Sequence, residues 1–473
     1  MIGLALSSRS LALAGLALYA LLGGAMALRS DGVWLADDIT HFQYARDSWR
    51  DPRLLLDEWG RPGCTVPLAL VARVGSQQAG LMLARFMMLG FMLTSATLAW
   101  RVARRLGAPA ASIVPLLLLL MPEAFGKSYT PCTEAPAALY AMVGTWLLSR
   151  GRRWEAAVVL SLLPTTRHEL ILLLVPLAAY FLLRRDRWAA ILLGSGEVAW
   201  NAACSWSGLR LPILRYVTTK PVESYGTGDA THYLVGWVLM AGIVIVLLTL
   251  IGSAVILVRA WRSGRLRGWQ RPGRLHRRTR VRLAVIGGAL GLVAIQTLLY
   301  MFNRFASGGY SFFLVPAAPW MAICACHGLT PWIARRRRGV VLRGVLKHVL
   351  PVLALLLAVP QWLSSVRPYR LTASERLMQR VIEELVVADP SCHVIGNIAW
   401  IPYFRDESSR LREMTPLDAW RRDRAFTVYY LADPFWESDA MLREVLAVWH
   451  DGMREYPIEG SHRGLIVLWR RPR

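Results

Sequence analysis

Long apolar stretches recur along most of the chain, and they restrict the fold more than any other feature. The apolar stretches that could be transmembrane helices, which need roughly 20 residues each, occur near 9–28, 79–100, 107–121, 133–149, 188–204, 233–258, 283–301, 310–328 and 346–364. A further stretch, 154–183, is interrupted by PTTRHE and is predicted to form a hairpin whose first helix is unusually short. Hydrophobic residues make up 55% of the chain, which excludes an ordinary soluble domain. We therefore predict an α-helical polytopic membrane protein with about eleven transmembrane helices.

The formal net charge of +24 follows membrane topology and does not indicate nucleic-acid binding. If the spans alternate, the arginine clusters at 101–105, 150–153, 184–187, 259–282 and 335–338 share one side, which the positive-inside rule makes cytoplasmic. The opposite side receives the loops 30–66, 122–134 and 207–232, the PTTRHE turn, the turn 302–309 and the C-terminal tail. We expect a multi-pass protein of a bacterial inner (plasma) membrane, with these loops extracytoplasmic.

The first apolar segment has two interpretations. GGAMA before Leu28 resembles a signal-peptidase site, but the apolar core is long for a signal peptide. We interpret the segment as a membrane anchor and leave its cleavage open, because the following loop is exterior in either case.

The character of the sequence changes at residue 367. RLTASERLMQRVIEELVVADP and SDAMLREVLAVWHDG have helical spacing, whereas SCHVIGNIAWIPYF, AFTVYYLADPF and GLIVLWRRP are rich in β-forming residues. We predict a membrane domain at 1–366 and a small extracytoplasmic α/β domain at 367–473, which packs on the membrane domain or binds an acceptor. Four cysteines lie on or near the exterior side, where a disulfide could persist, but no pairing can be assigned: Cys64, Cys132, Cys204 and Cys392.

Two adjacent aspartates open a helical pattern in the first exterior loop. Asp37, Asp38, His41 and Tyr44 are spaced so that all four could share one edge of that helix. Alternatively, Asp37 is an N-cap and Asp38 interacts favourably with the helix dipole. Further polar side chains fall on the same side of the membrane and favour a shared site: Lys127, Glu134, Arg304 and Tyr310.

The PTTRHE turn places three polar residues, Arg167, His168 and Glu169, inside an apolar stretch. Charged residues in such a stretch are costly unless they face a polar cavity, so they indicate function. We expect them at the floor of an exterior cleft. The alternative is a tight turn at the lipid headgroups, with Arg167 neutralised by lipid phosphate.

Four motifs, in this order and on this side of the membrane, resemble the GT-C superfamily of integral-membrane glycosyltransferases, especially the protein O-mannosyltransferase and aminoarabinose transferase type. They are ADDITHFQYARD, SYTPCTEAPAAL, PTTRHE and GGYSFFLVPAAPW, and the resemblance covers roughly residues 1–330. It implies transfer of a hexose or pentose from a polyprenyl-phosphate carrier to a protein, lipid or glycan acceptor. It places Asp37 and Asp38 in the first-loop acidic pair and Glu134 as the acid of the second loop. Relatives often carry an arginine after the tyrosine, whereas Ser311 follows Tyr310 here, so Arg304 could substitute.

The residue types fit this chemistry. Asp38 or Asp37 would act as the base for the acceptor hydroxyl, with inversion, and each acid would raise the pKa of the other. The candidate contacts to the donor phosphate are Arg167, His168, Lys127 and Arg304; the residues expected to line the substrate are His41, Tyr44, Glu169 and Tyr310. Glu134 would orient the acceptor or, with Asp38, hold a divalent cation. Metal dependence is open, and no other cofactor is indicated.

Two other classes of function remain. A transporter or flippase of a lipid-linked or polar substrate would place polar residues at the bilayer midplane in two matching halves, and the sequence shows no such repetition. A non-catalytic assembly subunit would use the C-terminal region to bind a partner. An enzyme should instead bring an aspartate of the first loop, Glu134 and Arg167 around one exterior cavity.

Overall fold

The computed structural model describes residues 8–57, 59–214, 227–262, 277–304, 308–333, 340–389, 392–395, 400–405, 428–432, 452–457 and 465–470. Three predicted features lie outside these residues: the arginine run 335–338, most of the arginine-rich loop between 259 and 282, and nearly all of the helix expected at 438–452. The described part is largely helical, and its strands all follow residue 392.

The elements of the first half are, in chain order, α1 (Ser8–Arg29), α2 (Ala36–Asp47), η1 (Pro52–Leu55), α3 (Pro62–Ala72), α4 (Gln77–Leu106), η2 (Ala111–Ile113), α5 (Val114–Leu119), α6 (Pro122–Lys127), α7 (Glu134–Arg150), α8 (Arg153–Leu160), α9 (Leu163–Thr166), η3 (His168–Leu170), α10 (Ile171–Leu183), α11 (Arg187–Leu192), α12 (Ser195–Trp206) and η4 (Pro212–Leu214). The second half contains α14 (His232–Ala241), α15 (Ile243–Arg262), α16 (Arg277–Met301), η8 (Ser311–Ala317), α17 (Ala318–Gly328), α18 (Thr330–Ile333), α19 (Val340–Ser365), α20 (Ala373–Ala388), β1 (His393–Ile395), α21 (Trp400–Arg405), β2 (Val428–Ala432), β3 (Gly452–Tyr456) and β4 (Leu465–Arg470).

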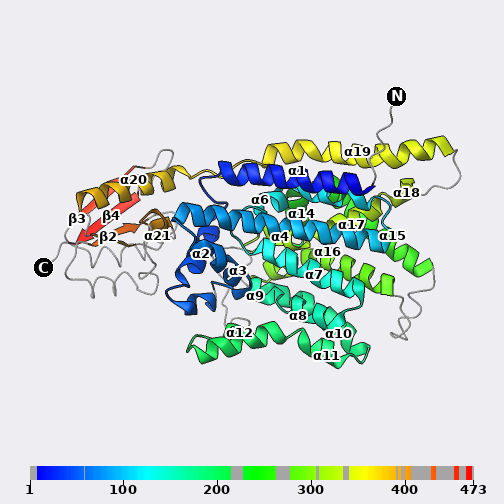
Figure 1. Cartoon of the computed structure of the whole chain (residues 1–473), viewed down its shortest axis with the longest axis horizontal. Helices are drawn as coiled ribbons and strands as arrows, with labels where there is room; N and C mark the ends of the chain where they lie inside the picture. Colours follow the sequence, from blue (N-terminus) through cyan, green and yellow to red (C-terminus); the bar gives the residue numbers. More distant parts are fainter. Residues whose placement is uncertain are drawn as a thin grey trace.

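The helices of the membrane region form a bundle in which α1 and α19 run along one side (Figure 1). Glycines permit the closest contact, between α15 and α17: a Cβ at Gly252 would overlap the Cys324 carbonyl, and one at Gly328 would overlap the Leu248 carbonyl. Small residues allow such close backbone approach where apolar burial between helices gives little driving force. All six cysteines are buried and free, so the structure contains no disulfide between the exterior ones.

Among the described residues, five helical segments are long and apolar enough to cross a membrane: Arg9–Arg29, Gln77–Leu106, Ile243–Arg262, Arg277–Met301 and Ser311–Gly328. Other expected spans are shorter or divided. Gly242, at φ 83°, separates α14 from α15 within the stretch predicted as one span. The PTTRHE stretch is broken as predicted, because Arg167 is extended between α9 and η3. A multi-pass helical membrane protein is therefore supported, whereas the count of eleven spans is not established.

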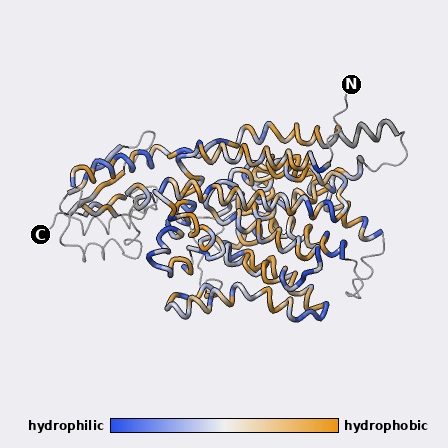
Figure 2. The backbone as a smooth tube through the Cα atoms, in the orientation of Figure 1, coloured by the Kyte–Doolittle hydropathy of each residue, from blue (hydrophilic) through white to orange (hydrophobic). Residues whose placement is uncertain are grey.

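The described arginine clusters meet at one end of the bundle. An Arg153 Nη1 to Asp186 Oδ2 ion pair of 2.5 Å joins two of them, Arg280 donates to the Tyr180 hydroxyl at 2.9 Å, and Arg282 donates to the Leu106 carbonyl. Hydrophobic residues fill the middle of the bundle, and hydrophilic ones are more frequent towards its ends (Figure 2). This grouping agrees with the predicted alternation of the spans.

The described C-terminal residues form two helices, α20 and α21, and a four-stranded sheet with the order β1-β2-β4-β3. β1 is parallel to β2, and β4 is antiparallel to both β2 and β3. The stretch SCHVIGNIAWIPYF is only partly extended, because its second half forms the helix α21, where the Trp400 and Phe404 rings stack. This region lies beside α2 (Figure 1), with the Tyr403 ring 6.4 Å from the Phe42 ring.

Candidate active site

The two aspartates of the first loop have different environments. Asp38 is fully buried, and its Oδ2 accepts hydrogen bonds from the backbone N–H groups of Trp34 and Leu35 at 3.1 and 3.4 Å. It thereby closes the N-terminus of α2, whose N-cap is Leu35, and satisfies backbone donors that the helix leaves unpaired. The alternative from the sequence made Asp37 the N-cap and gave Asp38 an interaction with the helix dipole. Asp37 is not the N-cap, whereas Asp38 does lie in the first turn, where it also accepts the hydrogen bonds that close the helix end.

Asp37 is exposed at the same helix end. The surrounding protein removes part of the hydration of its carboxyl group and so raises its pKa; Arg61 opposes this shift, and Asp38 adds to it. The sequence-based expectation that each acid would raise the pKa of the other is met for Asp37. This carboxylate is accessible, and its proton affinity is increased.

Lys127, at the end of α6, is the partner of Asp38. Its Nζ lies 3.2 Å from Asp38 Oδ1, and neither side chain is exposed. The ammonium group also lies 4.3 Å from the Phe312 ring centroid and 5.1 Å from that of Trp34. Burial, the largest single influence, lowers the pKa of Lys127, but Asp38 together with the other nearby negative groups, Glu134 among them, raises it by more, so the net pKa is above the ordinary value. Lys127 is therefore a buried, charged residue between an acid and two aromatic faces.

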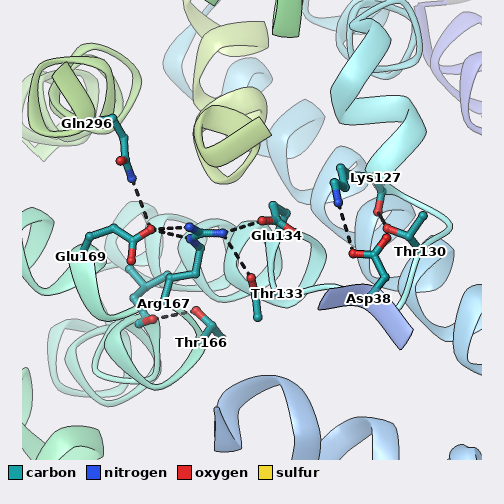
Figure 3. A network of polar contacts seen from close by, with 10 residues as sticks. Asp38, Lys127, Thr130, Thr133, Glu134, Thr166, Arg167, Glu169 and Gln296 are labelled. Atoms are coloured by element: carbon teal, nitrogen blue, oxygen red, sulfur yellow. Dashed lines mark hydrogen bonds and ion pairs between the residues drawn. The ribbon is translucent and has the colours of Figure 1, made fainter. Parts of the chain in front are cut away.

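Arg167 is the centre of a second cluster, shown beside the Asp38–Lys127 pair in Figure 3. Its Nη1 donates to Glu134 Oε1 at 2.6 Å and its Nε to Glu169 Oε1 at 2.6 Å. Gln296 donates to the same Glu169 oxygen at 3.3 Å. The extended backbone at the break in the PTTRHE stretch directs the guanidinium between two buried carboxylates. Fork-shaped pairing of this kind holds the guanidinium in one orientation.

The run that follows Tyr310 supplies aromatic rings where relatives often have an arginine. Phe313 lies 3.9 Å from the Arg167 guanidinium carbon, and Phe312 covers Lys127. Tyr310 is 43% exposed and stacks on Phe312 at 5.2 Å. η8 therefore contacts both buried cations through neighbouring phenylalanines.

The other residues expected in the site are not members of the two charged clusters. His41 is buried on α2 and Tyr44 is half-buried. His168 stacks on the Trp200 ring at 5.3 Å. Arg304 is exposed beyond the end of α16, and among the described residues no hydrogen bond or ion pair joins its side chain to the buried clusters. The expectation that Arg304 replaces a phosphate-binding arginine therefore gains no support.

The acidic and basic side chains of the site form ion pairs with one another, which differs from the arrangement that the sequence predicted. The sequence predicted acids and cations facing each other across a shared hollow, whereas Lys127 and Arg167 are buried and bonded to carboxylates. A cavity of about 460 Å³ at the same end is lined by residues of α14 and of the segment just before it, together with Gly309 and Ser311, and not by Asp37 or Arg167. Its Ser311 donates to Glu123 Oε1 at 2.6 Å. That cavity is therefore not the predicted common one.

Metal binding by Asp38 and Glu134 is not favoured. Each of these carboxylates already faces a cation, Lys127 or Arg167. Within the part of the chain that the structure describes, no three His, Cys, Asp or Glu side chains are grouped as metal ligands.

Arg61 is a site residue that the sequence analysis missed. It is half-buried with a left-handed backbone (φ 55°) at the N-cap of α3, and its charge acts on both Asp37 and Glu169. Such a backbone is uncommon for a residue other than glycine and often marks a functional site. The only signal in the sequence is the Gly60-Arg61-Pro62-Gly63 run, which reads first as a turn.

Comparison with known proteins identifies the fold. No protein-family model matches the sequence, and no curated protein matches it either. Crystal structures of ArnT from Cupriavidus metallidurans, bound to undecaprenyl phosphate and in the apo state, each superpose with a TM-score of 0.60, at 14% identity over 96% of this chain and 97% of that chain. The archaeal oligosaccharyltransferase AglB from Archaeoglobus fulgidus, in complex with an inhibitory peptide and a dolichol-phosphate, gives a TM-score of 0.53, at 12% identity over 84% of this chain and 64% of that one. The predicted GT-C-type fold is confirmed.

Proposed function

We propose that this protein is an integral-membrane glycosyltransferase that moves a sugar from a polyprenyl-phosphate carrier to an acceptor at the extracytoplasmic face. The fold is shared with ArnT and AglB, whose structures contain undecaprenyl phosphate and dolichol-phosphate. A fold alone does not determine function. The observation that carries the proposal is the exposed Asp37 carboxylate with a raised pKa, beside Arg61 and next to a buried array of fixed charges.

Asp37 is the proposed base, in preference to Asp38. Asp38 is enclosed and its oxygens are engaged by two backbone N–H groups and Lys127, whereas Asp37 reaches solvent. The Asp37 carboxylate accepts the proton of the acceptor hydroxyl while that oxygen attacks the anomeric carbon. The bond between this carbon and the phosphate oxygen breaks, and its electron pair leaves with polyprenyl phosphate. Attack opposite the leaving group inverts the anomeric configuration.

Arg61 is the proposed direct contact to the donor phosphate, because it is half-buried beside the proposed base. Arginine binds phosphate with two parallel hydrogen bonds. Lys127 and Arg167 would act mainly through their fields, since Asp38, Glu134 and Glu169 hold them in place. Fixed positive charges that need no reorganisation stabilise the charge developing on the leaving phosphate.

A transporter or flippase is not favoured. The described charged clusters lie at the ends of the bundle, around α2, α6 and η3 or among the arginines at the other end. Such an arrangement differs from the paired sites at the bilayer midplane that many secondary transporters use.

The test is a transfer assay with purified protein in liposomes, supplied with several polyprenyl-phosphate sugars and a panel of protein, lipid and glycan acceptors. We expect one donor to lose its sugar to an acceptor, and Arg61→Gln to raise the KM for that donor. The matched control, Arg53→Gln, removes an exposed arginine whose partner is Asp51 and should leave KM unchanged. Movement of intact donor between leaflets, with no sugar transferred, would indicate the flippase instead.

A further inference from the structure

The segment 366–371, which lies between α19 and α20, is bound to the chain just before α2. Tyr369 N–H donates to Ser30 Oγ at 2.9 Å, and the Tyr369 carbonyl accepts from the N–H groups of Asp31 and Gly32 at 3.0 and 3.1 Å. Leu371 N–H donates to Asp31 Oδ1 at 3.1 Å. We refer to residues 366–371 as the strap.

Residues 30–32, to which the strap is hydrogen-bonded, are also held by α4. Arg85 of α4 is buried and donates to the carbonyls of Ser30 and Gly32 at 2.7 and 2.6 Å. A Cβ at Gly32 would lie 2.6 Å from the Arg370 carbonyl carbon, so the strap passes too close for any larger residue there. Residues 30–32 are therefore fixed between α4 and the strap.

The Tyr369 side chain extends this contact towards the charged site. Its ring stacks on Tyr129 at 5.2 Å and meets the edge of Trp34 at 5.6 Å. Its hydroxyl lies so close to α6 that a Cβ on Gly126 would be 2.5 Å from it. Gly126 precedes Lys127 in the chain, so Tyr369 packs on the helix that carries this cation.

Trp34 connects Tyr369 to both members of the Asp38–Lys127 pair. The Trp34 backbone N–H donates to Asp38 Oδ2 at 3.1 Å, and the Trp34 ring centroid lies 5.1 Å from Lys127 Nζ. A shift of Trp34 would therefore displace two things together: the hydrogen bond to Asp38 that closes the N-terminus of α2, and the aromatic ring that packs on the Lys127 ammonium group.

We propose that Tyr369 is a positioning residue for the active site: through Trp34 and Gly126, the strap holds the N-terminus of α2, and hence Asp37, in register with Lys127. This inference rests on the proposed function, because it assigns Tyr369 a part in sugar transfer. It also gives the C-terminal region a role, since α21 contacts α2 as well, through the Tyr403 and Phe42 rings. The C-terminal region is then a structural part of the catalytic site in the membrane domain.

The experiment compares Tyr369→Leu, which removes the stacking ring, with Tyr369→Phe, which keeps it. We expect Tyr369→Leu to lower kcat by about 10- to 100-fold, the loss typical of a small displacement of reacting groups, with little change in the donor KM. Tyr369→Phe should retain most of the activity. The matched control is Tyr456→Leu, which removes a half-buried tyrosine of β3 that packs on Arg454.

Hydrogen exchange gives a readout that does not depend on activity. Amides 31–35 should exchange faster in Tyr369→Leu than in the wild type or in Tyr456→Leu, with the unfolding temperature little changed. An unchanged kcat per folded molecule, or unchanged exchange at 31–35, would overturn the positioning role. If the wild-type protein transferred no sugar, the proposed function would fail, and the exchange data would still decide whether the strap orders residues 31–35.

Discussion

Adjacent residues of the same type have different roles in this site. The Asp38 oxygens close a helix and hold a lysine, whereas Asp37 points to solvent beside Arg61. The sequence predicts the pair and its position at a helix start, but it cannot separate the two acids. The separation depends on Lys127, which lies 89 residues further along the chain.

The pH dependence of transfer should report on Asp37. Its pKa is raised by partial desolvation, and only the deprotonated form accepts a proton, so activity should be lost on acidification at a pH above the ordinary aspartate value of about 3.9. Arg61 favours the charged form, so Arg61→Gln should move this acid limb to higher pH. Measuring kcat/KM from low to neutral pH for both proteins checks this. An acid limb that moved to lower pH, or stayed in place, would contradict it.

The buried Asp38–Lys127 pair should be important for stability. Replacing Lys127 by Met leaves the Asp38 carboxylate buried without its cation, which typically costs about 3–5 kcal/mol. Adding Asp38→Asn should restore part of the loss, because the uncompensated charge is then gone. Unfolding temperatures of the two single variants and the double variant in detergent measure this coupling. Purely additive effects would show that the two side chains do not depend on each other.

At the scale of elements, the site depends on close contact between α3 and α9. Gly63, two residues after Arg61, lies so near α9 that a Cβ would be 2.5 Å from Thr165 Oγ1 and 2.7 Å from Thr166 Cγ2. The Gly63 carbonyl also accepts a hydrogen bond from the Tyr140 hydroxyl at 2.9 Å. This contact places Arg61 near the residues that follow Thr166.

Gly63→Ala should therefore push α3 away from α9, lower the unfolding temperature and reduce transfer activity. Gly90→Ala is the matched control, because its added Cβ has no neighbour within 4 Å. In the interior of α4, that change should be neutral or stabilising by up to about 1 kcal/mol. Equal behaviour of the two variants would show that the α3–α9 contact does not matter.

The elements also show what the sequence can predict. Long apolar helices and the break in PTTRHE were predicted correctly, because hydropathy and a charged interruption are local signals. The division at Gly242 and the helix α21 in a β-rich stretch were not predicted, since backbone conformation there depends on packing. The contact between the Phe312 ring and Lys127 was not predicted either, because the two residues are far apart in the sequence and meet only in the folded chain.

At the scale of the whole molecule, the charged site and the described arginine clusters lie at opposite ends of the bundle. Labelling of single cysteines with a membrane-impermeant maleimide in intact cells tests this, because the six native cysteines are buried. Arg53→Cys, in exposed η1, should react in intact cells. Arg152→Cys, exposed at the other end, should react only after permeabilisation. The reverse pattern would place the site in the cytoplasm and exclude an extracytoplasmic acceptor.

The most direct measurement of the central claim is the rate of sugar transfer by Asp37→Asn. Asparagine keeps the shape of the side chain but cannot act as the base, so kcat should fall by about 100- to 10,000-fold while the donor still binds. Asp51→Asn, which alters another acid of the same loop, should retain normal activity. An Asp37→Asn protein with the kcat of the wild type would contradict the account.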